Sequence, residues 1–156
     1  MEGVEMKKTQ VFNSFGSLYK GKTVLITGHT GFKGSWLTAW LLSLGAKVVG
    51  YSAYLPSDPC NFMVCGLGNY IASIEGDIRD IGTLKQIFLK YKPEFVFHLA
   101  AQPIVRRAYD YPKLTFDTNV MGTVNVLESI RTTSGVKAAV IITSDKCYQN
   151  VEWTWG

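Results

Sequence analysis

The sequence predicts an α/β fold, a doubly wound parallel sheet of the Rossmann type with strand order 3-2-1-4-5. Three observations indicate this fold. Short runs rich in Val and Ile alternate with stretches whose apolar residues have helical spacing. The first run leads into a glycine-rich turn (TGHTGFKGS, 27–35), and a helical pattern follows directly. The chain has 156 residues, of which 47% are hydrophobic and 18% charged, so it can bury the core of one domain.

The first half of the chain supplies three predicted strands and one helix. The first strand is expected at 22–27 and the first helix at 35–45, where Gly45 suits a helix C-terminus. Trp36 and Trp40 lie four residues apart on that helix and are expected in the core. The second strand is expected at 46–53 and the third at 70–78. Between them, 54–69 contains prolines and glycines without a clean period and is expected to be irregular.

The second half continues the alternation. A helix is expected at 80–92 and is ended by Pro93; its apolar face consists of Leu84, Ile87 and Phe88. The fourth strand is expected at 94–101 and the fifth at 136–144. Between them, 111–135 predicts one long helix with Pro112 in its first turn. The buried stripe predicted for this helix is Val120, Val124 and Leu127. Ligands of such a sheet bind at the carboxyl ends of its strands.

Composition and charge narrow the class of protein. The net charge is +4 and the basic residues are dispersed, which does not indicate a nucleic-acid-binding stripe. No stretch approaches the ~18 consecutive apolar residues of a membrane span. Residues 1–20 are expected to form a polar leader that docks Phe12, Phe15 or Tyr19, and 21–156 one Rossmann-like domain. The chain has three cysteines, an odd number, and they contain no C-x-x-C pair: Cys60, Cys65 and Cys147. This pattern indicates reduced cytosolic thiols rather than disulfides, and it does not indicate a metal site.

The turn after the first strand holds Gly28, Gly31 and Gly34, spaced three apart. In this place Gly28 permits a tight turn, and Gly31 leaves no Cβ between the backbone and a diphosphate. Gly34 lets the helix pack close to the strand. The first N–H groups of the helix would then face the phosphates. The sequence therefore predicts a dinucleotide site here, the alternative being a turn that serves packing alone.

The spacing G-x-x-G-x-x-G after Thr27 resembles the extended short-chain dehydrogenases/reductases, the branch that contains nucleotide-sugar enzymes. Within that branch, GHTGFKGSW and SDKCYQN resemble the CDP-glucose 4,6-dehydratase family, and the resemblance covers nearly all of 15–156. It implies CDP-D-glucose as substrate, CDP-4-keto-6-deoxy-D-glucose as product and NAD as a bound cofactor. It also implies deoxysugar biosynthesis for lipopolysaccharide O-antigen by a cytoplasmic homodimer, without nucleic-acid or membrane partners.

The resemblance assigns residues to the two ligands. GDI at the third strand end resembles the pair that meets the adenine, and HLAAQ the segment beside the nicotinamide ribose. The cofactor residues that it implies are Gly28, Thr30, Gly31, Phe32, Lys33, Gly34, Tyr51, Asp77, Ile78, Leu99, Ala100, Ala101, Gln102, Thr118 and Thr143. The implied substrate residues are Gln102, Pro103 and Arg106, with Arg107 as the alternative partner of the diphosphate. No acidic residue stands at the second strand end, so NAD rather than NADP rests on the resemblance.

The implied reaction uses NAD as an internal hydride carrier: hydride leaves C4 of the sugar, water is lost across C5 and C6, and hydride returns to C6. Ser144 would hydrogen-bond the C4 oxygen, with Thr143 as the alternative because strand registers are uncertain by one residue. Asp145 would protonate the leaving C6 hydroxyl, which requires a raised pKa. Lys146 stands where dTDP-glucose dehydratases have a Glu base, and it could act as a base only with a lowered pKa.

Two histidines allow more than one interpretation. His98 ends an apolar strand and is expected to be a hydrogen-bonded core residue rather than a catalytic one. His29 and Lys33 lie in the glycine turn, where Lys33 either approaches a phosphate or is exposed to solvent together with His29.

Superfamily members oxidise with a Tyr whose phenol is made acidic by a Lys four residues further on, one helical turn away. The sequence ends at Gly156 without this motif, and Tyr109 and Lys113 have the spacing but flank Pro112. We therefore expect later strands and the substrate-binding region to be missing, the fifth strand to be an open edge, and the chain alone to be inactive. Two other hypotheses are another nucleotide-sugar epimerase or decarboxylase, and a non-catalytic dinucleotide-binding module.

Overall fold

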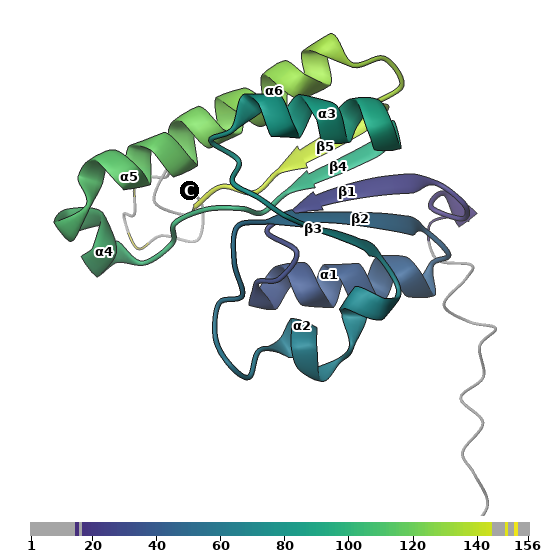
Figure 1. Cartoon of the computed structure of the whole chain (residues 1–156), viewed down its shortest axis with the longest axis horizontal. Helices are drawn as coiled ribbons and strands as arrows, with labels where there is room; N and C mark the ends of the chain where they lie inside the picture. Colours follow the sequence, from purple (N-terminus) through teal and green to yellow (C-terminus); the bar gives the residue numbers. More distant parts are fainter. Residues whose placement is uncertain (1–14, 16, 145–148, 150–151, 153–156) are drawn as a thin grey trace, which may run out of the picture.

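A five-stranded parallel sheet forms the centre of the structure (Figure 1). The computed structural model describes residues 15, 17–144, 149 and 152. The strand order is β3-β2-β1-β4-β5, and every neighbouring pair is parallel, so the predicted doubly wound order is confirmed. The strands are β1 (Thr23–Thr27), β2 (Lys47–Ser52), β3 (Ala72–Glu75), β4 (Phe95–His98) and β5 (Ala138–Ile141).

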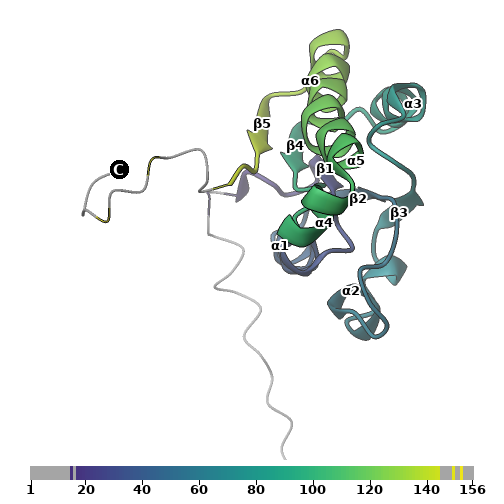
Figure 2. The same ribbon diagram turned by 90° about the vertical axis from the view of Figure 1, so that its left-hand side faces the viewer.

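Helices cover both faces of this sheet (Figures 1 and 2). One face carries α1 (Phe32–Ser43), α2 (Asn61–Val64) and the short 3-10 helix η2 (Leu67–Asn69). The other face carries α3 (Ile81–Tyr91) and α6 (Gly122–Thr132). Beyond the carboxyl ends of the strands lie α4 (Val105–Asp110), α5 (Pro112–Phe116) and the π-helical turn η3 (Asp117–Met121). Within the part of the chain that the structure describes, no helix has the length and apolar character needed to cross a membrane.

The core has two apolar layers, one on each face of the sheet. The alternation of side chains along β1 sends Val24 and Ile26 toward α1, and Leu25 toward α3 and α6. The apolar face predicted for α3 is buried: Leu84, Ile87 and Phe88. Gly45 ends α1 as predicted, with a φ of 80° and the paired backbone hydrogen bonds of a Schellman motif.

The long helix predicted at 111–135 is interrupted, and the face that it buries differs from the predicted one. The π-helical turn η3 separates α5 from α6, and the buried face of α6 is formed by Gly122, Val126 and Ser129. The predicted buried stripe is therefore wrong, because its three residues are 46–49% exposed: Val120, Val124 and Leu127. Close packing explains the difference. The Ile78 side chain occupies the space that a Cβ at Gly122 would need, so the helix turns its smallest residue inward.

Trp36 and Trp40 were expected in the core, and this prediction is wrong because they are 60% and 48% exposed. The buried face of α1 consists of smaller residues that allow close approach to the sheet: Gly34, Ser35, Thr38 and Leu41. The stretch 54–69 is not wholly irregular, since it contains α2 and η2. The helix α4 was not predicted at all.

The aromatic residues before β1 dock onto the α1 side of the sheet. The Tyr19 ring packs against Phe95 and Phe97, with centroid distances of 5.2 and 6.5 Å. Phe15 lies edge-on to Tyr19 and Trp40 and is 56% exposed. At one edge of the sheet, β5 pairs with β4 alone among the described strands. Its residues Ala138–Val140 are exposed, as expected for a sheet edge.

Candidate functional site

The glycine turn joins β1 to α1 at the carboxyl edge of the sheet. Gly28 has a φ of 75°, and its N–H donates to the Tyr51 carbonyl at 2.8 Å. A Cβ on Gly28 would lie 2.8 Å from the Ala100 nitrogen, and one on Gly34 would overlap the Gly28 carbonyl. The structure therefore agrees with the physical reasons predicted for both glycines, a tight turn and close packing of α1 on β1.

Gly31 differs from the other two glycines, because its environment is open. Its φ is −66°, and the nearest atom that a Cβ would meet is the Gly28 carbonyl oxygen at 3.3 Å. No side chain caps the N-terminus of α1, and Phe32 and Lys33 in its first turn are exposed. The turn is thus a cradle that a side chain at position 31 would fill, beside the positive end of a helix. Such a cradle fits a diphosphate.

A buried network fixes the turn to the neighbouring strands. His29 is 1% exposed and hydrogen-bonds Ser52 Oγ at 2.9 Å and Ser73 Oγ at 2.8 Å. The Thr30 N–H donates to the same Ser52 oxygen at 3.3 Å. Burial lowers the pKa of His29 to about 4, against the opposite effect of the Tyr51 carbonyl, so the imidazole is neutral at pH 7. The alternative of an exposed His29 is wrong.

His98 is a hydrogen-bonded core residue, as predicted. It is 2% exposed, and its ring nitrogens lie 2.6 Å from Thr27 Oγ1 and 3.0 Å from Thr123 Oγ1. The Thr123 hydroxyl donates to the Asn119 carbonyl at 2.7 Å, so Nε2 of His98 carries the proton and Nδ1 accepts one from Thr27. Burial lowers the pKa of His98 to about 4.

The segment after β4 is held by an amide clamp. Asn119 accepts the Gln102 N–H at 2.7 Å through Oδ1 and donates to the Gln102 carbonyl at 3.0 Å through Nδ2. The Gln102 side chain in turn bonds the N–H and carbonyl of Ile104 and the hydroxyl of Thr115. Gln102 was predicted to contact both ligands. Its amide is engaged in shaping this loop, so its expected ligand contacts stay predictions.

The end of β3 brings a carboxylate to the same edge of the sheet. The Asp77 side chain accepts hydrogen bonds from Arg79, which lower the pKa of its carboxyl. Tyr51 lies beneath it in the core, completely buried, and donates its hydroxyl proton to the Asp77 carbonyl at 2.9 Å. Burial raises the pKa of Tyr51 to about 12, helped by the carboxylates of Asp80 and Asp77. The Tyr51 side chain therefore supports the site from the core, and the cofactor contact predicted for this residue stays a prediction.

The other predicted residues lie at the carboxyl edge as well. Leu99, Ala100 and Ala101 follow β4, and Thr118 lies half-buried in η3. Thr143 and Ser144 follow β5 and are exposed. The predicted acid and base, Asp145 and Lys146, lie outside the described residues. Ile78 is buried against α6.

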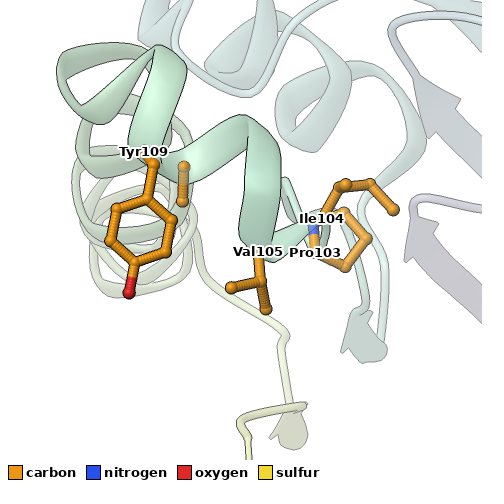
Figure 3. Close-up of a pocket in the computed structure, with 5 residues that line it drawn as sticks. Pro103, Ile104, Val105 and Tyr109 are labelled. Carbon is orange, nitrogen blue, oxygen red and sulfur yellow. The ribbon is translucent and has the colours of Figure 1, made fainter.

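An apolar pocket of about 290 Å³ lies on α4, next to the predicted substrate residues (Figure 3). It is lined by Pro103, Ile104, Val105, Ala108 and Tyr109. Arg106 and Arg107 are exposed on the same helix. Tyr109 belongs to α4 and Lys113 to α5, and the Lys113 ammonium is paired with Asp117 at 2.5 Å. Tyr109 and Lys113 thus do not form the one-turn pair of a Y-x-x-x-K motif.

Comparison with known proteins gives the chain a family. Residues 25–153 match the family model described as GDP-mannose 4,6 dehydratase. The chain belongs to this family. CDP-glucose 4,6-dehydratase of Salmonella typhimurium is 51% identical over 140 residues, which are 90% of this chain and 39% of that protein. The chain thus spans about two fifths of the length of this relative.

Solved structures of related enzymes share the fold. An epimerase of Methanothermobacter thermautotrophicus has a TM-score of 0.75 and 30% identity, over 94% of this chain and 42% of its own. UDP-glucose-4-epimerase of Stenotrophomonas maltophila, solved with NAD and formylated UDP-arabinopyranose, has a TM-score of 0.76 and 26% identity, over 86% of this chain and 40% of its own. The matched relatives of this GDP-mannose 4,6 dehydratase family member are nucleotide-sugar dehydratases and epimerases.

Sequence reasoning missed several residues that shape the site of this family member. Asn119, Thr123 and Ser73 act through hydrogen bonds to segments distant in sequence, which no local period marks. Arg79 directly follows the GDI stretch, two residues after Asp77, and its charge so close to a carboxylate was the available signal.

Proposed function

We propose that this chain binds NAD at the carboxyl edge of its sheet, as part of an enzyme that converts CDP-D-glucose to CDP-4-keto-6-deoxy-D-glucose. The observation that supports cofactor binding is the open cradle at Gly31, beside the uncapped N-terminus of α1. The solved relative that holds NAD supports the same cofactor. The substrate is supported by the 51% identity to a CDP-glucose 4,6-dehydratase.

The glycine turn would hold the diphosphate of the cofactor through the backbone of Gly31, Phe32 and Lys33. Asp77 would meet the adenine, and the segment 99–101 together with Thr118 and Thr143 would line the nicotinamide side. NAD is favoured over NADP because the guanidinium at the end of β3, on Arg79, is already paired with Asp77. A 2′-phosphate would have to displace that carboxylate.

When bound, NAD supplies reversible acceptance of hydride. Ser144 follows β5, from where its hydroxyl would hydrogen-bond the C4 oxygen of the sugar, with Thr143 as the alternative. We assign to Asp145 the proton for the leaving C6 hydroxyl, and to Lys146 the removal of the C5 proton. Arg106, exposed beside the apolar pocket of α4, would pair with the diphosphate of the sugar nucleotide.

We further propose a homodimer formed through the outer face of α5 and α6. Apolar side chains on this face are 46–66% exposed at intervals of about one helical turn: Phe116, Val120, Val124 and Leu127. We place the protein in the cytoplasm. Cys60 and Cys65, free thiols among the described residues, suit that reducing compartment.

Isothermal titration calorimetry with NAD and NADP tests the cofactor assignment. We expect NAD to bind, and NADP to bind about tenfold more weakly or worse. The reason is that Asp77 already neutralises the Arg79 charge that would attract the 2′-phosphate of NADP. A folded chain that binds neither dinucleotide would overturn the assignment. Stronger binding of NADP would overturn the choice of NAD.

A further inference from the structure

The turn between β3 and α3 is held by the side chain of one residue on α6. Nδ2 of Asn125 donates to two successive carbonyls of this turn, that of Ile78 at 3.0 Å and that of Arg79 at 3.1 Å. These partners lie 47 and 46 residues away along the chain, so both bonds join distant segments and do not belong to the helix itself. The Asn125 side chain therefore spends its donor group on the backbone of the turn.

Packing fixes the same turn at a second point. Ile78 is 4% exposed, and its side chain fills the space beside Gly122, where a Cβ would lie 2.5 Å from Ile78 Cδ1. Gly122 and Asn125 are three residues apart, so they lie on the same face of α6. This face of the helix receives both the side chain and the backbone of the turn.

The sheet holds the turn from the other side. The Tyr51 hydroxyl donates to the Asp77 carbonyl at 2.9 Å, and the Tyr51 carbonyl accepts the N–H of Gly28 in the glycine turn at 2.8 Å. All three carbonyls of 77–79 are thus engaged by side chains of the protein. Tyr51 and Asn125 together define where this turn lies relative to the diphosphate cradle.

The same helical segment holds the opposite end of the proposed site. Thr123 Oγ1 lies 3.0 Å from His98 Nε2, and Asn119 bonds both backbone groups of Gln102. The inner face of η3 and α6 therefore sets how far the turn at 77–79 lies from the segment after β4. In the proposed site these two segments flank the adenosine and the nicotinamide side of the cofactor.

Helix stability does not explain an asparagine at position 125. Alanine and leucine are better helix formers than asparagine, whose side chain competes for backbone hydrogen bonds. The apolar contact at Gly122 already docks the turn on α6. The amide of Asn125 adds two directional bonds, which define the position of a backbone more sharply than apolar packing does.

We propose that Asn125 is a positioning residue, which holds the turn at 77–79 at the distance from the glycine turn that a bound adenosine diphosphate group requires. This inference rests on the proposed binding of NAD. Asn125 acts through the backbone of the turn and does not need to touch the cofactor. Without its amide the turn stays docked through Ile78, but its backbone can shift, so the adenosine half of the cofactor loses affinity.

Calorimetry with NAD and ADP tests the proposal on the wild-type chain and on Asn125→Ala, Asn125→Gln and Ser129→Ala. Ser129 is the matched control, because it is buried on the same helix and its hydroxyl bond, to the Asn125 carbonyl at 2.7 Å, stays within α6. Urea titration establishes that each variant is folded under the conditions of the calorimetry.

We expect Asn125→Ala to bind both ligands about tenfold more weakly, the effect of losing one or two hydrogen bonds. Asn125→Gln keeps the amide donor and should recover part of this loss, whereas Ser129→Ala should bind both ligands as the wild-type chain does. A role in helix stability alone predicts the opposite, because Ser129→Ala would then weaken binding as much as Asn125→Ala.

A folded wild-type chain that binds neither ligand overturns the proposed function and this inference together. Where the wild-type chain binds NAD, an unchanged affinity of Asn125→Ala overturns the inference alone. So does a loss confined to NAD and absent for ADP, an equal loss in Ser129→Ala, or no recovery in Asn125→Gln. If Asn125→Ala does not fold, Asn125→Ser takes its place, and the same outcomes apply to it.

Discussion

The Thr27 hydroxyl donates a 2.6 Å hydrogen bond to the His98 imidazole, between residues that face each other at the ends of β1 and β4. The Ala100 N–H donates to the same hydroxyl at 3.2 Å. Through Thr123 the opposite ring nitrogen reaches α6. The neutral His98 ring thus links β1, the segment after β4 and α6. A second proton on the ring would remove the nitrogen lone pair that accepts the hydrogen bond from Thr27.

The two histidines predict how stability depends on pH. Both have a pKa near 4 in the fold and an ordinary value of 6.5. Between these values the unfolded chain binds more protons, so the free energy of unfolding falls as the pH is lowered through this window, with no loss above 6.5. Each histidine contributes a slope of up to about 1.4 kcal/mol per pH unit. Urea unfolding at about pH 5, 6 and 7.5 measures this slope.

Four carboxyl groups whose pKa values are also lowered in the fold add a slope of the same sign, nearer the acid end of this window, so a histidine variant is needed to isolate the histidine contribution: Asp77, Asp80, Glu94 and Glu128. His98→Asn should remove about half of the slope if it folds. A stability that is flat between about pH 5 and 6.5 would contradict the neutral assignment of both rings.

Gly31→Val should abolish NAD binding, and the chain should still fold with some loss of stability, because only one atom lies close to the new Cβ. A side chain at this position meets the Gly28 carbonyl at 3.3 Å and otherwise enters the open cradle. Circular dichroism and NAD calorimetry measure the two properties. Gly68→Val is the control, since its Cβ would make an ordinary contact at 3.7 Å with Phe62 and belongs to η2 rather than to the glycine turn. Unchanged NAD affinity in folded Gly31→Val would show that the diphosphate is bound elsewhere.

Gly34→Ala, in contrast, should destabilise the fold itself. Its methyl group would overlap the Gly28 carbonyl, which is backbone and cannot move aside cheaply. We expect the free energy of unfolding to drop by about 1–3 kcal/mol or more, measured by urea titration. Gly68→Ala should change it by much less. Equal stability of the two variants would mean that α1 is free to shift on β1.

Val124→Glu should dissociate the proposed homodimer without unfolding it. Val124 is 46% exposed on the outer face of α6, so a carboxylate there is harmless in a monomer and costly in a desolvated interface. Sedimentation velocity measures the change in oligomeric state. Leu89→Glu is the control, because Leu89 is 65% exposed on α3. A wild-type chain that is monomeric, or a dimer that tolerates Glu at 124, would reject this interface.

The isolated chain should not convert CDP-glucose with NAD, while a chimera in which residues 15–156 replace the matching part of the Salmonella relative should do so. The chain covers 39% of that relative. In the chimera, Asp145→Asn should slow elimination by about 100-fold and let an NADH-like absorbance accumulate. Product formation by the isolated chain, read by NMR, would mean that its own residues complete the site. Normal turnover of the Asp145→Asn chimera would remove Asp145 from its role.

The sequence predicted the features that depend on local pattern. Alternating apolar runs indicated the sheet order, and the spacing of Gly28 and Gly34 indicated the turn. It failed where long-range packing decides. Val120 and Val124 look like a buried stripe, but the place under the helix is filled by Ile78, so Gly122 faces inward instead. The hydrogen bonds of His29 to two serines on other strands could not be predicted from the sequence either, because they join residues distant in sequence.

The contact between Gly122 and Ile78 has an evolutionary consequence. The side chain of Ile78 already fills the volume of a Cβ at 122. Asn125, on the same helix as Gly122, donates a hydrogen bond to the Ile78 carbonyl at 3.0 Å, so neither residue can shift to make space. The two positions can change only together: in homologous sequences, a larger residue at 122 should be accompanied by a smaller one at 78. An alignment of the family would then show correlated substitution between the segment that follows β3 and the start of α6.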